Sequence, residues 1–212
     1  MADGAADGTV EPGLAAVAAL DADLAGVLDR HGPPPPRDRP PGFATLFSIV
    51  VQQQVSLASA RAIWARLEQG LGAMKPARIL ACDSAELCAL GLSRPKARYA
   101  LALAEAVDSG QLDLGGLAGL DDEQAIAALT AVTGIGRWTA EIYLLSALRR
   151  PDVWPAADLA LMVAAQDLKG LPERPDATAM TALSQAWRPW RTFAARLLWH
   201  HYRHARGRET SL

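Results

Sequence analysis

Two glycines that flank an isoleucine form the segment of this chain whose spacing points most clearly to chemistry. Gly134, Ile135 and Gly136 lie between two segments with helical patterning, so one helix ends and the next begins at once. Glycine lets another backbone approach closely, and the first N–H groups of the second helix suit a phosphate group. A tight turn that binds nothing has the same pattern. A dinucleotide-binding loop is excluded, because such a loop follows a strand.

An acidic residue follows 22 positions after Gly136, at the start of another predicted helix. This residue is Asp158, in the segment Pro155-Ala156-Ala157-Asp158-Leu159. Aspartate at such a position is commonly an N-cap and nothing more. Near a phosphate-binding turn, the carboxylate can instead stabilise positive charge that develops on a sugar ring. These residues alone leave both interpretations open.

Composition narrows the classes of protein to which the chain can belong. It has 212 residues, half of them hydrophobic, a formal net charge of −2 and two cysteines. Cys82 and Cys88 are too few for a four-cysteine iron–sulfur cluster or a cysteine-rich zinc site. The first residues lack a basic signal-peptide region, and no stretch reaches the ~20 apolar residues that cross a membrane. We therefore expect a cytoplasmic protein, and the net charge alone gives no indication of a nucleic-acid partner.

Helical periodicity recurs along the whole chain, and no segment alternates with period two, so the predicted fold class is all-α. Ser56 is a predicted N-cap, and Asp121 with Gln124 a predicted capping box. The proline run at residues 33–36 predicts a stiff linker. Helices are expected at residues 14–28, from 43, from 56 to about 70, after 84, from 95 to 110, from 121 to 129, at 137–148, 158–168 and 178–187, and from 190 to about 203.

Four blocks of this chain, taken together, resemble the helix-hairpin-helix DNA glycosylases of the bacterial 3-methyladenine DNA glycosylase II type. Along the chain, the blocks are Val51–Ser56, Gly134–Ala140, Pro155–Leu159 and Trp187–Arg191, and that family has them in the same order. The resemblance implies two helical lobes with a helix-hairpin-helix motif and an active-site cleft between them. It also implies a monomer that binds damaged double-stranded DNA, acts at the nucleoid, and requires no cofactor and no membrane.

The resemblance implies that Asp158 is the catalytic residue and that Trp138 and Trp199 line the pocket for the extruded base. An electron-rich indole attracts a cationic alkylated purine. Trp138 stands where glycosylases with lyase activity carry a lysine, and an indole cannot form a Schiff base. We therefore expect a monofunctional enzyme that releases purines of the 3-methyladenine and 7-methylguanine type. Core packing is the alternative role for both tryptophans, and Trp64, Trp187 and Trp190 are expected to be structural.

DNA contacts are expected from two further blocks of the resemblance. Gln53 and Gln54 correspond to the tip that fills the gap left by an extruded nucleotide, whereas Gln52 fits the polar end of a helix. Phosphate contacts are expected at Gly134, Ile135, Gly136 and Thr139. No firm metal site is expected, although the backbone of Thr133 and Gly136 is a candidate ligand set for a monovalent cation. Lys96 and Arg98 are expected to be solvated, and His200, His201 and His204 to form a basic helix face.

The predicted organisation is a disordered tail at residues 1–12 and two lobes. Residues 13–39 and 122–212 are expected to form the lobe with the hairpin and Asp158, and residues 40–121 the lobe with the intercalating loop. Ile142 and Ala157 stand where some relatives carry an aromatic residue and a second acid, and we expect the chain to lack the additional N-terminal β-rich domain that some relatives have. The alternatives are a non-catalytic DNA-binding protein and a monofunctional glycosylase for mismatched or deaminated bases.

The net charge of −2 is an average over two unlike ends of the chain. Six acidic residues fall within the first 29 positions, whereas residues 186–208 hold six arginines and no acidic residue. This basic segment suits contact with phosphate groups. A nearly neutral protein should depend on such local contacts more than on its overall field.

Overall fold

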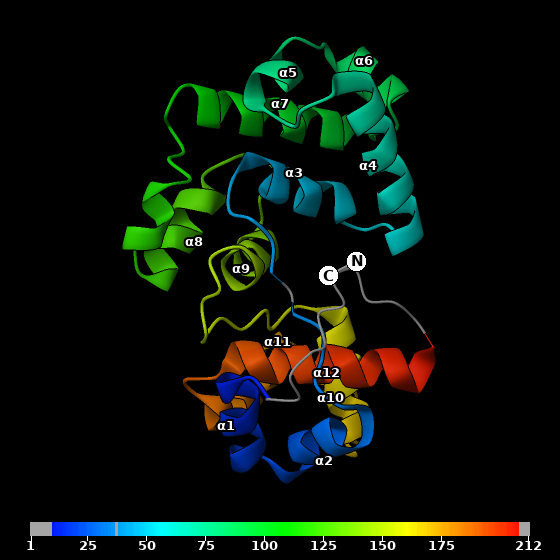
Figure 1. Ribbon diagram of the computed structural model, residues 1–212, viewed down its shortest axis with the longest axis vertical. Coiled ribbons are helices and arrows are strands. Elements are labelled where there is room, and N and C mark those ends of the chain that lie inside the picture. Colours follow the sequence, from blue (N-terminus) through cyan, green and yellow to red (C-terminus); the bar gives the residue numbers. More distant parts are fainter. Residues whose placement is uncertain (1–9, 37, 208–212) are drawn as a thin grey trace, which may run out of the picture. The chain divides into compact units, whose positions relative to one another are not determined.

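The computed structural model describes residues 10–36 and 38–207, and these residues form helices and loops without a β-strand. The all-α prediction is therefore confirmed. None of the helices in these two ranges is both long and apolar enough to cross a membrane. In chain order the elements are α1 (Pro12–Leu20), α2 (Ala22–His31), α3 (Phe43–Gln52), α4 (Leu57–Leu71), α5 (Pro76–Leu80), α6 (Ser84–Ala89), α7 (Arg94–Asp108), η1 (Gly116–Gly119), α8 (Asp122–Thr130), α9 (Arg137–Ser146), α10 (Leu159–Leu168), α11 (Ala177–Ser184), η2 (Gln185–Trp187) and α12 (Arg191–Arg206) (Figure 1).

The described residues divide into two compact units. Unit 1 contains residues 10–36 and 156–207, and unit 2 contains residues 38–155. This division differs from the predicted lobes at residues 122–155, which lie in unit 2. The reason is packing: α9 contacts both α3 and α8, and the Tyr143 hydroxyl accepts the Gly42 N–H at 2.8 Å. The hairpin therefore shares a core with the helix that precedes the glutamine loop.

Unit 1 is organised around its last helix. In unit 1, α12 packs against α10, α2 and α1 (Figure 1). Its buried face carries Leu197, Leu198 and Trp199, and Leu14 and Leu24 are fully buried on α1 and α2. This packing explains why a helix rich in arginine and histidine is stable: one face is apolar and removed from water.

The N-terminal region contains two helices where the periodicity predicts one. Asp21 has an extended backbone and ends α1, and its side chain accepts the N–H groups of Asp23 and Leu24 as the N-cap of α2. The single predicted helix at residues 14–28 is therefore wrong, because the cap interrupts it without shifting the apolar positions to another face. Of the predicted disordered tail, residues 1–9 lie outside the described residues, and α1 begins at Pro12.

Local capping signals placed several helices correctly. Ser56 accepts the Ser59 N–H at 3.2 Å, which confirms its role as the N-cap of α4. Asp121 and Gln124 form the predicted capping box of α8. The short helix α5 was not expected, since it has only five residues and no periodic pattern. Cys82 and Cys88 are both free thiols.

Candidate functional site

The turn between α8 and α9 in unit 2 is built around a buried isoleucine. The Ile135 side chain is buried, and its N–H donates to the Val132 carbonyl at 3.1 Å. Gly136 is the N-cap of α9, and no side chain caps this helix end. The first backbone N–H groups of α9 therefore form a positively polarised helix end, which suits a phosphate group.

The two glycines of the turn serve different purposes. Gly134 has φ +91°, and a Cβ atom added there would lie 2.1 Å from Cγ of Tyr99. Only glycine fits this position. Gly136 has an ordinary φ of −86°, and a Cβ atom added there would meet nothing within 4 Å. The space beside Gly136 is therefore not filled by the protein's own side chains, as an approaching backbone would require.

Gln53 connects the loop after α3 to this turn. Its amide nitrogen donates to the Gly134 carbonyl at 3.1 Å and to the Thr139 hydroxyl at 2.8 Å. Both Gln53 and Thr139 were predicted to contact DNA, yet here their polar groups bond to each other inside unit 2. The glutamine loop and the hairpin are consequently one connected piece, although 81 residues separate Gln53 from Gly134.

Gln54 occupies the exposed position of the same loop. It is exposed and has φ +55°, a left-handed backbone conformation that non-glycine residues rarely adopt. Such strain is often found at ligand-binding positions. Of the two glutamines expected at the tip, Gln54 is therefore the one whose side chain the loop presents to solvent.

Lys96 on α7 supports this loop from inside unit 2, where the sequence indicated a solvated side chain. Its ammonium group is buried and donates to the Val51 carbonyl at 2.7 Å, near the end of α3. Burial lowers the pKa of Lys96, because the charged form loses solvation. A cation is favourable at the C-terminal end of a helix, and Lys96 occupies that position from a neighbouring helix.

Trp138 lies in the first turn of α9 and is half-buried.

Arg137, the residue before Trp138, has its positive charge compensated by two carboxylates. Arg137 donates to both oxygens of Glu123 at 2.6 and 3.0 Å and to Glu141 at 2.9 Å. The hydrogen bonds to Glu123, with help from the Glu141 charge, raise the pKa of Arg137 further above its usual value. An anion that binds at the hairpin would therefore contact backbone N–H groups, because the Arg137 guanidinium is already engaged.

Asp158 in unit 1 is both a helix cap and part of a side-chain pair. Its Oδ1 accepts the Leu161 N–H at 2.9 Å, as the N-cap of α10, and also the Trp199 indole N–H at 3.1 Å. Asp158 is 8% exposed and Trp199 only 1%. Trp199 was predicted to stack on a base; this geometry instead gives it a buried ring and a hydrogen bond that orients the carboxylate.

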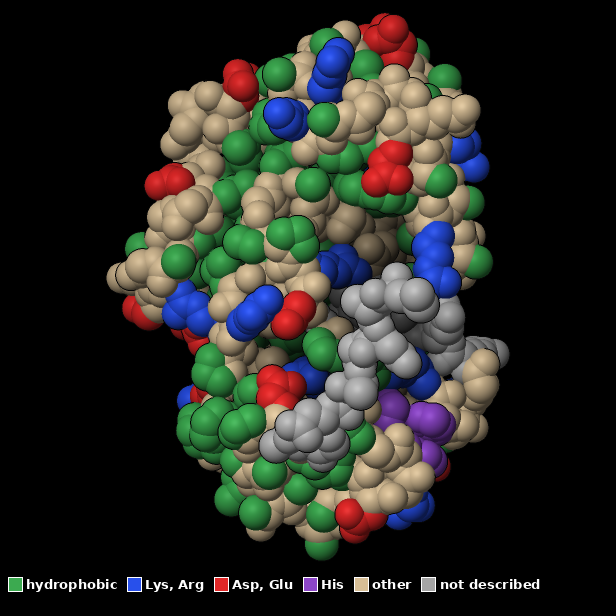
Figure 2. Space-filling view, in the orientation of Figure 1, with side chains coloured by type: hydrophobic (Ala, Val, Ile, Leu, Met, Phe, Trp, Pro, Cys, Tyr) green, Lys and Arg blue, Asp and Glu red, His purple; other side chains and the backbone are tan. Residues whose placement is uncertain are grey.

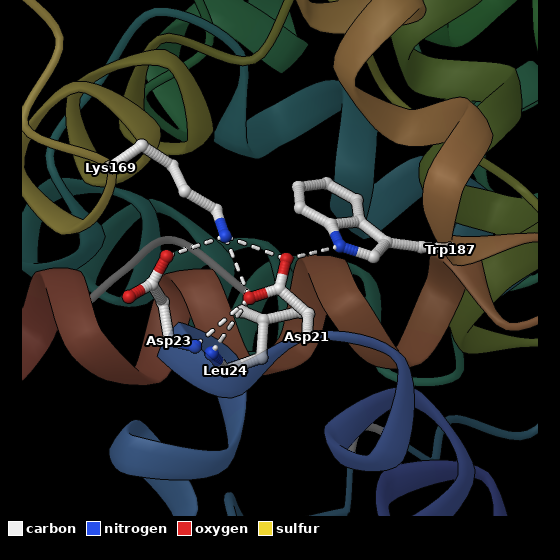
Figure 3. Close-up of polar contacts among 5 residues, drawn as sticks. All are labelled: Asp21, Asp23, Leu24, Lys169 and Trp187. Atoms are coloured by element: carbon white, nitrogen blue, oxygen red, sulfur yellow. Dashed lines mark hydrogen bonds and ion pairs between the residues drawn. The ribbon is translucent and has the colours of Figure 1, made fainter.

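A partly buried ionic network lies at the end of α10 opposite to Asp158, and the sequence did not indicate it. The Lys169 ammonium lies 2.6 Å from both oxygens of Asp21 and 2.7 Å from Asp23, and the Trp187 indole N–H donates to Asp21 at 2.7 Å (Figure 3). Desolvation opposes both charges, yet the hydrogen bonds raise the pKa of Lys169 and lower that of Asp21. The network joins the start of α2, the end of α10 and η2. The one available signal was the position of Lys169 just before Gly170, where cations favour a helix end.

The arginine-rich C-terminal segment is only partly available to a ligand. Arg196 is buried and pairs with Glu11 at 2.6 Å, and Arg203 donates to Nδ1 of His200 at 2.9 Å. Arg206 is exposed and lies over the Tyr202 ring, whereas Arg208 lies outside the described residues. Some arginines of the predicted basic segment are therefore engaged in contacts within unit 1 and are not available to phosphate groups.

Histidine side chains gather in one patch of unit 1, as Figure 2 shows in purple. The His31 and His204 rings stack 4.1 Å apart, and the His200 ring lies 4.6 Å from His204. Burial, with nearby positive charge, lowers the pKa of His31 and of His200. Within residues 10–36 and 38–207, no group of three or more His, Cys, Asp or Glu side chains is arranged to hold a metal ion.

Comparisons with known proteins identify the family of the chain. The model of the HhH-GPD superfamily of base excision DNA repair proteins matches residues 47–189, which include the glutamine loop, the hairpin and Asp158. The chain belongs to this superfamily. The match covers more than half of the chain and ends within the tryptophan-rich segment that precedes α12.

Relatives in this superfamily include proteins named for alkylated-base repair. DNA-3-methyladenine glycosylase 2 of Escherichia coli is 30% identical over 190 residues, which cover 82% of this chain and 64% of that protein. The chain spans less than two thirds of the length of the curated bacterial relatives that it matches.

Two solved structures extend the similarity to the fold of nearly the whole chain. The crystal structure of a DNA-3-methyladenine glycosidase from Bacillus halodurans has a TM-score of 0.76 and 33% identity, covering 91% of this chain and 89% of that one. The 3-methyladenine DNA glycosylase Mag1 of Schizosaccharomyces pombe, in complex with abasic DNA, has a TM-score of 0.82 and 28% identity. That match covers 92% of this chain and 97% of Mag1.

Proposed function

We propose that this protein is a monofunctional DNA glycosylase that extrudes alkylated purines of the 3-methyladenine and 7-methylguanine type from duplex DNA and hydrolyses their N-glycosidic bonds. The superfamily places the chain in base excision repair. The names of its relatives support an alkylated base as the substrate. We also propose that the protein acts at the nucleoid as a monomer, because its proposed substrate is DNA and every residue that we assign comes from one chain.

The observation that carries the proposal is the fixed carboxylate of Asp158. One of its oxygens receives two hydrogen bonds, from Leu161 and Trp199, and the side chain is almost completely removed from water. A carboxylate held in this way is preorganised to stabilise positive charge on a deoxyribose ring. Its interaction with that charge is strong because the surroundings have a low dielectric constant.

The proposed reaction follows from the charge of the substrate. The bond between C1′ and the purine nitrogen breaks, and the purine leaves with the electron pair. An alkylated purine that was cationic becomes neutral in this step, so a strong general acid is not needed. Water then adds to C1′ and releases a proton, while Asp158 stabilises the oxocarbenium-like sugar. Trp138 is assigned to the base, because an indole face attracts a cationic ring.

DNA binding is assigned to the hairpin and to the glutamine loop. The N–H groups at the start of α9 are proposed to bind one phosphate group, and Gln54 to occupy the gap left by the extruded nucleotide. A monovalent cation at the hairpin fits the Thr133 carbonyl, which accepts none of the hydrogen bonds within the described residues. The Gly136 carbonyl is already an acceptor for the Ala140 N–H at 3.1 Å. Such a cation would supply positive charge beside the phosphate.

The absence of lyase activity is proposed from the positions of the lysines. The chain has three, Lys75, Lys96 and Lys169, and Trp138 stands where a Schiff-base lysine would be needed. The Lys96 and Lys169 ammonium groups are engaged with Val51 and with Asp21. The product strand should therefore remain intact until alkali is added. Nicking by the pure protein without alkali would contradict this assignment.

Release of free bases from methylated duplex DNA tests the proposal directly. The wild-type protein should release 3-methyladenine or 7-methylguanine, and Asp158→Asn should lower the rate by at least ~100-fold, a typical effect of removing one preorganised electrostatic group. Binding of the variant to the same duplex should be retained. No release by the wild-type protein would favour a non-catalytic DNA-binding protein. Equal release by the variant would remove Asp158 from the mechanism.

A further inference from the structure

Three histidines of unit 1 lie together where α2 meets α12, and the proposed reaction does not use them. His31 is the last residue of α2, and His200 and His204 lie about one turn apart on α12. The His31 and His204 rings are nearly parallel, with their centroids 4.1 Å apart. The His200 ring meets the His204 ring edge-on at 4.6 Å. These three side chains form the histidine cluster.

The contacts of His200 require a neutral ring. Its Nε2 lies 3.2 Å from the His31 carbonyl oxygen, which can only accept, so Nε2 carries the hydrogen. This bond satisfies a carbonyl at the end of α2 that has no partner within that helix. Nδ1 of His200 accepts a hydrogen bond from Nη2 of Arg203 at 2.9 Å, because a guanidinium can only donate. A proton added to Nδ1 would set two donors against each other and break the bond to Arg203.

The stacked pair of rings also favours the neutral state. Two imidazolium rings 4.1 Å apart would repel each other, and only one of them can be charged without that cost. Burial and the charges of His204 and Arg30 lower the pKa of His31. Burial lowers the pKa of His200 more than its hydrogen bond to the His31 carbonyl raises it. Geometry and solvation therefore act in the same direction.

Within the described residues, no carboxylate compensates the histidine cluster. On α10, Asp167 pairs with His201 at 2.6 Å. Beside α1, Glu11 pairs with Arg196 at 2.6 Å. On α2, Asp29 is exposed and is not among the groups that shift the pKa values of the cluster. Protonation of the cluster would therefore add positive charge where no negative charge balances it.

Adjacent residues of α12 connect the histidine cluster to the candidate site. The His200 ring bonds α12 to the last carbonyl of α2, and the Trp199 indole bonds α12 to Asp158 at the start of α10. Both side chains are almost entirely buried. A displacement of this turn of α12 away from α2 therefore moves the indole that orients the carboxylate.

We propose that the histidine cluster is an acid-sensitive latch, whose neutral rings join α12 to α2 and whose protonation releases this turn of α12 and the fixed orientation of Asp158. Its stabilising contribution is present above the ordinary histidine pKa of 6.5 and is lost as pH falls through the lower folded-state values of His31 and His200. The three histidines are positioning residues. Only the effect on base release rests on the proposed function, since the latch itself belongs to the fold of unit 1.

The protonation state of His200 is the first test. NMR of the whole protein with 15N-labelled histidine, at about pH 7.5, should show His200 with its hydrogen on Nε2. On acidification, His200 should titrate below 6.5, the ordinary value for histidine. The missing signals in His200→Gln assign the resonances. A hydrogen on Nδ1 at neutral pH, or a titration midpoint at or above 6.5, would overturn the latch.

Thermal unfolding of a double variant measures the latch without reference to activity. His200→Gln with His204→Phe keeps a donor, an acceptor and an aromatic ring, but neither new side chain titrates. Between about pH 7.5 and about pH 5.5, the thermal midpoint of the wild-type protein should fall at least ~3 °C more than that of the double variant. Equal falls would overturn the proposal.

Two single variants complete this measurement. His204→Phe leaves both hydrogen bonds of His200 in place, so it should stay folded and lose part of the acid sensitivity. His201→Gln is the matched control, because it removes a histidine of α12 that bonds to Asp167 instead. This control should retain the acid sensitivity of the wild-type protein. Full acid sensitivity in His204→Phe, or its loss in His201→Gln, would contradict the assignment to the histidine cluster.

Base release under single-turnover conditions tests the connection to Asp158. After subtraction of spontaneous release, the wild-type rate of 3-methyladenine release should fall between about pH 7.5 and about pH 5.5 by at least ~3-fold more than the rate of the double variant. At the higher pH, both proteins should react at the same rate. The same fall in both proteins would overturn the connection between the latch and Asp158. No release by either protein at any pH would remove the proposed function, whereas the histidine titration and the thermal midpoints would still decide whether the latch exists.

Discussion

At the scale of single residues, the hydrogen bond between Trp199 and Asp158 is the contact on which the proposed catalysis most depends. The indole N–H and the Leu161 N–H meet at one carboxylate oxygen, so the carboxylate has a fixed orientation. An aspartate that only capped α10 would need the Leu161 bond alone. The additional bond comes from a buried tryptophan 41 residues away in sequence, and it restricts the carboxylate to one orientation.

Trp199→Phe should separate orientation of Asp158 from packing. The variant keeps an aromatic ring and loses the N–H donor, so kcat should fall by about 10- to 100-fold, with KM for damaged duplex changing little. Unfolding should become easier by about 1–3 kcal/mol, because a smaller ring leaves a cavity. Trp190→Phe, in the same unit and not bonded to Asp158, should retain activity. A Trp199→Phe protein with wild-type kcat would show that the bond has no catalytic importance.

Local sequence patterns could identify only those residues whose structural role depends on their neighbours in sequence. The Gly134–Gly136 turn and Asp158 were found from their spacing. By contrast, Lys96 donates a hydrogen bond to a carbonyl 45 residues away, and Lys169 pairs with a carboxylate 148 residues away. No helical period encodes such pairings. The internal hydrogen bonds of Gln53 escaped prediction for the same reason, and so did the buried position of Trp199.

At the scale of elements, the hairpin shows how two glycines in one turn can differ. Gly134→Ala places a methyl group against the Tyr99 ring at a positive φ, so unfolding should become easier by at least ~1–3 kcal/mol. Gly136→Ala meets no atom of the protein and should leave stability within ~0.5 kcal/mol. Chemical denaturation followed by circular dichroism measures both.

DNA binding then distinguishes the roles of the two glycines. If a phosphate group approaches the start of α9, the methyl group of Gly136→Ala should weaken binding to duplex DNA although the protein stays folded. Fluorescence anisotropy with an undamaged duplex is the appropriate measurement. Wild-type affinity in a stable Gly136→Ala protein would exclude close approach of DNA at that residue.

The ionic network of unit 1 is a second prediction at this scale. Lys169→Met removes one partner of a largely buried pair, so unfolding should become easier by about 3–5 kcal/mol. The double variant Lys169→Met with Asp21→Asn should recover part of that loss, because the more buried of the two carboxylates is no longer left without a cation, whereas Asp23 is half-exposed to water. A double variant as unstable as the sum of both single changes would contradict coupling between them.

The pKa shifts of this network set the pH range over which it stabilises unit 1. The pKa of Asp21 is lowered, so its contribution is present above the ordinary value of 3.8 and is lost as pH falls through the lower folded-state pKa. The pKa of Lys169 is raised, so its contribution is present below 10.5 and is lost as pH rises through the higher folded-state pKa. Between those limits, the difference in stability between wild type and Lys169→Met should be constant.

Helices could be predicted from the sequence where their caps and apolar periodicity lie within the helix and the residues directly beside it. The helices that begin at Ser56 and Asp121 needed only their first turns to be recognised. The break at Asp21 was missed because apolar residues continue on the same face across it, and the cap competes with a continuous helix through its contact with Lys169. The placement of the hairpin in unit 2 depended on contacts of α9 with α3, which no local signal reveals.

At the scale of the whole molecule, several basic side chains near the proposed DNA-binding segments are already paired with carboxylates. Arg137 is engaged by Glu123, Arg149 by Asp38 and Arg150 by Asp122. Together with a net charge of −2, this leaves backbone N–H groups and few cations to meet the phosphates. The protein should therefore release few counterions when it binds a duplex.

The salt dependence of DNA binding measures that number. For two or three neutralised phosphates, the logarithm of the association constant should fall with the logarithm of salt concentration with a slope of about −2 to −3. Glu123→Gln weakens the hold on Arg137, so this variant should bind undamaged duplex more tightly at low salt and steepen the slope by up to ~0.9. Asp113→Asn is the matched control, because Asp113 is an acidic residue of unit 2 that accepts the Gly115 N–H and is not among the partners of Arg137. A wild-type slope steeper than about −5 would mean that a general electrostatic field, rather than local backbone contacts, holds the DNA.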